Sequence, residues 1–123
     1  MSERKKEMKS ETGRAGPVRP VETDGRSLRI GLCAIRGETS TYIDAAILEN
    51  GDLQLSGQDL GKAPLEIFGD SDYEYWLTVP REHKDHLLLL LLGMVYHGDV
   101  CVVSKLKDLL DAHSIPNTFF SYA

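Results

Sequence analysis

The chain has 123 residues, of which 41% are hydrophobic and 27% charged, a composition that is typical of one globular domain and excludes fibrous, collagen-like and fully disordered classes. The formal net charge of −5 is unevenly distributed, because residues 1–26 carry 7 basic and 5 acidic side chains whereas residues 27–123 carry 7 basic and 14 acidic ones. Since Lys and Arg supply most of the affinity for phosphates, the acidic body is not expected to bind nucleic acid.

Residues 1–26 are predicted to form a disordered basic tail. They include Gly13, Gly16, Pro17 and Pro20 and almost no large apolar side chain, so they cannot bury enough surface to offset the entropy lost on ordering. A solubilising extension is the simplest interpretation, and a contact of this tail with RNA, DNA or an acidic partner stays open. Residues 27–123 are then the single folded domain.

Cysteine content and apolar stretches predict the compartment. Cys33 and Cys101 are too few for a disulfide framework and too far apart for a CxxC pair. No apolar stretch follows the charged N-terminus, and the longest apolar run, residues 87–95, is about half the length needed to cross a bilayer. These features predict a cytoplasmic protein without a membrane span.

Alternating apolar residues, β-branched residues and turn signals predict four strands. The strands cover residues 27–36, 39–49, 52–57 and 72–79. Asn50 and Gly51, which both tolerate positive φ, favour a tight hairpin between the second and third strands. The stretch between the third and fourth strands contains several glycines and Pro64, so it is predicted to be a long loop with one helical turn at residues 64–68.

Two helices are predicted after the strands, over residues 81–96 and 99–114. Six consecutive leucines, residues 87–92, wrap the whole circumference of the first helix, which is therefore expected to be buried on several sides, against the sheet, the second helix or a second copy. A short extended segment at the C-terminus is expected to return to the sheet edge or to lie across the helices.

Strands followed by helices are the order of an α+β domain. The prediction is an antiparallel meander of about four strands, covered on one face by two packed helices, with a short C-terminal extended segment.

Three motifs resemble a known family. They are GQDLG at residues 57–61, GDSDYEYWLTVPREHKD at residues 69–85 and IPNTF at residues 115–119. Over roughly its C-terminal half the chain resembles a family of small uncharacterised bacterial proteins. The resemblance implies a bacterial, cytoplasmic, single-domain protein, and it implies no activity, cofactor or catalytic residue.

An acidic-aromatic surface is the leading candidate for a binding site. Glu74 and Trp76 share one face of the fourth strand, opposite Tyr73 and Tyr75. If the helices cover one face of the sheet, the other presents acidic and aromatic side chains, and aromatic residues are enriched at interfaces. The candidate binding residues are Asp59, Asp70, Asp72, Tyr73, Glu74 and Trp76. The resulting hypothesis is a small non-catalytic interaction module without a cofactor, with a protein partner that the acidic charge favours as basic.

A divalent metal ion is the alternative cofactor. Its candidate ligands are Asp70, Asp72, Glu82, His83 and His86, from the acidic loop and the start of the first long helix. The histidines do not form an HExxH motif, and ordinary surface charge explains both clusters more simply.

Other chemistry finds no support in the sequence. No serine lies in a GxSxG motif, and GQDLG lacks the Lys and Ser/Thr of a phosphate loop, so an enzyme is not favoured. A further alternative is a homodimer with a structural role through the leucine-rich helix.

Overall fold

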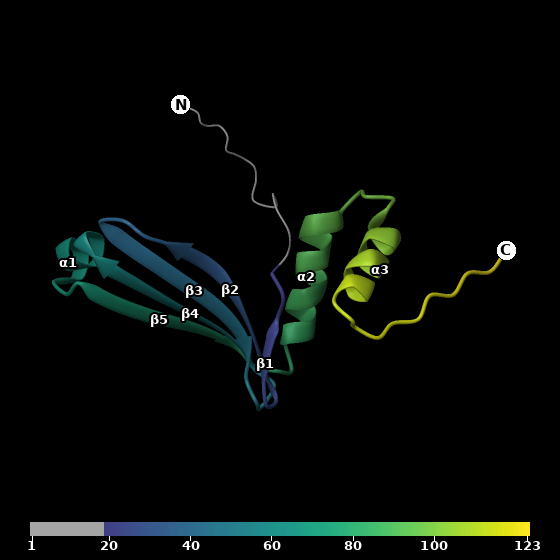
Figure 1. The fold of residues 1–123 in the computed structure, drawn as a ribbon, viewed down its shortest axis with the longest axis horizontal. Helices are drawn as coiled ribbons and strands as arrows, with labels where there is room; N and C mark the ends of the chain where they lie inside the picture. Colours follow the sequence, from purple (N-terminus) through teal and green to yellow (C-terminus); the bar gives the residue numbers. More distant parts are fainter. Residues whose placement is uncertain (1–18) are drawn as a thin grey trace, which may run out of the picture.

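The computed structural model describes residues 19–123, which form one sheet followed by two longer helices (Figure 1). The strands are β1 (Glu22–Asp24), β2 (Ser27–Ile35), β3 (Thr39–Ile47), β4 (Leu53–Gly61) and β5 (Asp72–Val79). The helices are α1 (Lys62–Phe68), α2 (Lys84–Tyr96) and α3 (Val102–Ala112). The predicted α+β class, with an antiparallel meander followed by helices, is confirmed.

The sheet is a meander in the order β1-β2-β3-β4-β5, and every neighbouring pair is antiparallel. The expected hairpin joins β3 to β4. In it Asp52 N donates a hydrogen bond to Asn50 Oδ1 at 3.0 Å, and Gly51 has a φ of 94°, which favours glycine. The turn residues therefore specify this hairpin locally.

Two strand predictions are corrected by the structure. β1 lies inside the segment predicted to be disordered, because Glu22–Asp24 pairs with the start of β2, while residues 1–18 lie outside the described residues. β4 continues to Gly61, where a loop was expected, and α1 contains the helical turn predicted at residues 64–68 and begins two residues earlier. Cross-strand pairing on both sides of β4 thus overrides the turn preference of its glycines.

Both long helices begin three residues later than expected. A tight turn precedes each one: His83 N donates to Pro80 O at 2.9 Å, and Val102 N donates to Asp99 O at 3.3 Å. Because these turns use up the first residues of each predicted helix, the helical spans are shorter than the sequence pattern indicates.

The sheet has one apolar and one polar face, because side chains alternate along a strand and directly paired residues share a face. The apolar sheet face carries Leu28, Ile30, Cys33, Ile35, Ile43, Ala45, Ile47, Leu53, Leu55, Tyr73, Tyr75, Leu77 and Val79, together with Thr41, Gly57 and Asp59. The polar sheet face includes Arg29, Tyr42, Asp44, Gln54, Ser56, Gln58, Asp72, Glu74, Trp76 and Thr78. The register of β2 shifts between Gly31 and Cys33, and this β-bulge lets the residues on both sides of it keep their side chains on the faces given above.

The start of α2 is fixed to the β3–β4 hairpin at one end of the sheet. Lys84 Nζ donates to Gly51 O at 2.6 Å, and Arg81 N donates to Asp52 Oδ1 at 2.9 Å. Figure 1 shows α2 and α3 beyond this end of the sheet rather than across it. The hydrogen bonds therefore set where the helix pair leaves the sheet.

Only one end of the apolar sheet face is covered by α2. The first turns of this helix line a groove of about 330 Å³ together with Leu28, Ile47 and Leu53. The expectation that two helices cover a face of the sheet is thus wrong for most of that face. The sequence pattern indicates that α2 is apolar on all sides, but it does not predict the direction in which the helix leaves β5.

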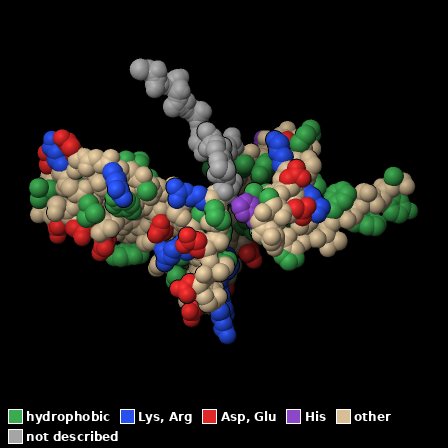
Figure 2. Space-filling view, viewed as in Figure 1, with side chains coloured by type: hydrophobic (Ala, Val, Ile, Leu, Met, Phe, Trp, Pro, Cys, Tyr) green, Lys and Arg blue, Asp and Glu red, His purple; other side chains and the backbone are tan. Residues whose placement is uncertain are grey.

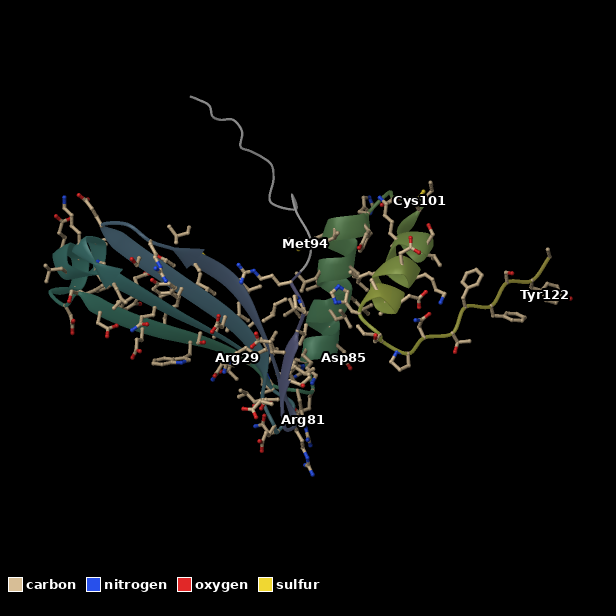
Figure 3. The ribbon with its side chains drawn as sticks, viewed as in Figure 1. Arg29, Arg81, Asp85, Met94, Cys101 and Tyr122 are labelled. Carbon is tan, nitrogen blue, oxygen red and sulfur yellow. The ribbon has the colours of Figure 1, made fainter. Side chains whose placement is uncertain are left out.

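The C-terminal segment also differs from its prediction. Asn117 Nδ2 donates to Asp111 Oδ1 and to Ile115 O, both at 2.9 Å, and the chain then runs away from α3 (Figures 1 and 3). Phe119 and Phe120 are 59% and 80% exposed. The segment neither returns to the sheet edge nor lies across the helices.

The hydrophobic core of the described chain is small. Within residues 19–123, the buried apolar side chains are Ala46 and Pro64, and α2 has no buried side chain. Figure 2 shows hydrophobic side chains at the surface over the sheet, the helices and the C-terminal segment. Hence the burial expected for the leucine-rich helix is not provided by these parts of one chain.

Candidate protein interface

The polar sheet face contains a hollow between acidic and aromatic side chains. Two rows of paired residues cross β5, β4 and β3 there: Trp76, Ser56 and Asp44 in one row, and Glu74, Gln58 and Tyr42 in the next. The small side chain of Ser56 lies between two larger neighbours and leaves a depression of about 230 Å³. We refer to these six residues as the Trp76 hollow.

Charged and polar contacts fix the rim of the Trp76 hollow. Arg29 Nη1 lies 3.3 Å from Asp44 Oδ2, and since both side chains are about half exposed this ion pair is weak. Gln58 Nε2 donates to Asp72 Oδ1 at 3.0 Å. Trp76 is 62% exposed, so the indole faces solvent beside these groups. The arrangement can accept a cation against an aromatic surface.

The residues predicted for the acidic-aromatic surface divide between the two sheet faces. Asp72, Glu74 and Trp76 lie on the polar sheet face, as their spacing predicts. Asp59 and Tyr73 are paired directly with each other on the apolar sheet face. The structure therefore brings together half of the predicted set, and it places Asp59 and Tyr73 on the opposite side of the sheet.

On the apolar sheet face, Asp59 holds neighbouring hydroxyl groups. Its Oδ1 accepts hydrogen bonds from Thr41 Oγ1 at 2.8 Å and from Tyr75 Oη at 3.4 Å. Burial raises the pKa of Tyr75 above its ordinary value, and the negative charge of Asp59 raises it further. Tyr73 stacks on Phe68 of α1 with ring centroids 4.2 Å apart. The ring stacking joins α1 to β5, and the hydrogen bonds of Asp59 link β3, β4 and β5.

Sequence reasoning missed Tyr42, Asp44 and Gln58. Tyr42 and Asp44 are two residues apart in β3 and share a face by simple alternation. Their proximity to Trp76 depends on the registers of β3 with β4 and of β4 with β5. The Asn50–Gly51 hairpin could have supplied the first register, but the second depends on the connection between β4 and β5, where the sequence predicts a loop with one helical turn and does not predict the extension of β4 to Gly61.

The candidate metal ligands lie at two separate places. Asp70 and Asp72 are at the start of β5, where Asp72 N donates to Asp70 Oδ1 at 3.0 Å. Glu82, His83 and His86 follow the other end of this strand. The eight residues of β5 separate the two groups by roughly 25 Å at about 3.3 Å per residue. Within residues 19–123, no group of three or more His, Cys, Asp or Glu side chains is arranged to hold a metal ion.

Comparison with known proteins gives no relative: no protein-family model, curated protein or solved structure matches the chain. Among the described residues, the helices are too short or too polar to cross a membrane. Functional inference therefore rests on the two faces of the sheet and on the helices.

Proposed function

We propose that the protein is a non-catalytic binding module that takes a basic segment of a protein partner on its polar sheet face. The observation that carries this proposal is the 62% exposure of Trp76 beside Glu74, above a hollow that Asp44 also lines. An exposed tryptophan side chain contributes little hydrophobic stabilisation to the fold, whereas tryptophan is among the residues that contribute most to binding at protein interfaces.

The chemistry of the Trp76 hollow selects a cation. A guanidinium or ammonium group within about 6 Å of the indole ring is attracted to its face, and a nearby carboxylate adds an ion pair. The excess of 14 acidic over 7 basic side chains in residues 27–123 attracts a basic partner over a longer range. Arginine fits better than lysine, because its planar group stacks on the ring while its edge donates to a carboxylate.

An arginine peptide tests the proposal directly, because Trp76 is the only tryptophan of the chain. We expect a capped hexa-arginine peptide to change the tryptophan fluorescence of the full chain saturably at low salt. The change should weaken as salt screens the charges. A capped hexaglutamate peptide should leave the fluorescence unchanged.

Two matched variants locate the binding in this titration. Glu74→Gln should weaken binding of the arginine peptide about threefold to tenfold, since it removes one exposed charge beside the ring. Glu66→Gln, which makes the same change on α1, should have little effect. Equal weakening by both variants, or no fluorescence change with the wild type, would contradict the proposed function.

A further inference from the structure

Most of the apolar sheet face has no cover among the described residues. Leu77 is 62% exposed and Ile35 is 60% exposed, although each points to the same side of the sheet as the leucines and isoleucines of its neighbours. The central residues Ile43 and Leu55 are also only partly buried. An exposed apolar surface of this extent is typical of a contact with another molecule.

The helix α2 has an uncovered apolar side of its own. Lys84, Leu87, Leu88 and Leu91 line the groove against the end of the sheet. At 100° per residue, Leu89, Leu90 and Gly93 fall on the other side of the helix. The exposed fractions of Leu89 and Leu90 are 69% and 56%. One chain thus carries two unpartnered apolar surfaces, one on the sheet and one on α2.

The described chain cannot close these two surfaces on each other. Lys84 and Arg81 bind the start of α2 to the β3–β4 hairpin, and the helix then leads away from the rest of the sheet (Figure 1). Residues 1–18 are a poor substitute, because Met1, Met8 and Val18 are their only large apolar side chains. A different apolar element is required.

We propose that this element is the α2–α3 pair of a second copy of the chain, and that two copies exchange their helix pairs reciprocally. The uncovered side of α2 from each copy lies on the apolar sheet face of the other. A two-fold axis relates the copies, so both contacts form together and the assembly closes as a dimer. The Trp76 hollow lies on the opposite face of the sheet and stays open, so this inference is independent of the proposed function.

The sizes of the surfaces agree with a dimer of this kind. Four strands of eight or nine residues give a face of roughly 500 Å², from about 4.8 Å between strands and 3.3 Å per residue. The two helices, at about 10 Å in width and 1.5 Å per residue, cover roughly 360 Å². Each copy contributes both a sheet contact and a helix contact, which together approach the roughly 800 Å² that a stable interface takes from each partner.

Sedimentation equilibrium of the full chain tests the exchange. We expect the wild type to sediment as a dimer, and both Leu89→Glu on α2 and Leu77→Glu on β5 to raise the dissociation constant about 100-fold, since each substitution occurs twice in the dimer. Val100→Glu is the matched control, because Val100 is 97% exposed in the connection between the helices and should leave the dimer intact. Circular dichroism checks folding, and Leu77→Thr replaces Leu77→Glu if that variant does not fold.

Every other outcome overturns the proposal. A wild-type monomer would assign the apolar sheet face to a different protein. A dimer sensitive only to Leu89→Glu would be a contact between helices, and one sensitive only to the Leu77 variants would be a contact between sheets. A larger, open assembly would exclude closed two-fold exchange.

Discussion

Gly61→Ala is expected to lower the free energy of unfolding by about 2–4 kcal/mol, which is a large part of the stability of a small domain. Gly61 joins β4 to α1 with a φ of 117° and a ψ of −135°, a conformation that only glycine adopts readily. A Cβ at this position would overlap the backbone oxygen of Glu38 and approach its carbonyl carbon to 3.2 Å. Since Lys62 N donates to the same oxygen at 3.0 Å, relief of the overlap breaks this hydrogen bond.

Chemical denaturation at one fixed protein concentration measures the effect of Gly61→Ala. Gly69→Ala is the matched control, because Gly69 also has a positive φ, of 78°, but a Cβ there would meet no atom within 4 Å. The control should cost only the strain of the left-handed conformation, about 1–2 kcal/mol. Equal losses for the two variants would show that the Glu38 contact is absent.

Gly57→Ala is expected to destabilise the chain by about 1–3 kcal/mol through the Tyr75 ring. This ring lies across Gly57 on the apolar sheet face, and an added Cβ would overlap ring atoms Cε2 and Cζ and lie 2.7 Å from Oη. The overlap forces the ring away from Gly57 and from the carboxylate of Asp59. A glycine covered by a cross-strand aromatic ring is a recognised way to stabilise a sheet.

A double-mutant cycle isolates this contact in denaturation experiments. In a Tyr75→Ala background, Gly57→Ala should cost much less than it costs in the wild type, because the ring that it displaces is gone. The raised pKa of Tyr75 supplies a second readout, since Gly57→Ala should bring the pH at which this tyrosine ionises back towards its ordinary value. An unchanged cost in both backgrounds would contradict the account.

The parts of the fold that follow from local chemistry were predictable from the sequence. Asn50 and Gly51 define their hairpin through turn geometry, and the bounds of β5, Asp72–Val79, agree with its alternation. The end of β4 was not predictable, because Gly57 and Gly61 indicate turns locally. Their functions, room for the Tyr75 ring and close approach to Glu38, depend on distant parts of the chain.

The position of the helices was also beyond the sequence pattern. A run of leucines on all sides of α2 predicts that the helix is buried, but it does not indicate which surface covers the helix. In the described chain that burial is not reached, since Leu89 is 69% exposed. The pattern and the structure agree if a second copy supplies the remaining contacts.

Half of the residues of the candidate site were predictable from the sequence. Alternation placed Glu74 and Trp76 together and Tyr73 opposite them, as the structure has them, whereas the position of Asp59 beside Tyr73 on the apolar sheet face depends on the register of β4 with β5. Asp44 joins Trp76 only through two strand registers.

We propose that the polar sheet face stays open for a partner while a second copy covers the apolar sheet face. Acrylamide quenching of Trp76, measured at protein concentrations below and above dimer formation, tests it most directly. We predict efficient quenching, as for an exposed indole, at every concentration. Protection of Trp76 as the dimer forms would place the second copy on the polar sheet face and would contradict the account.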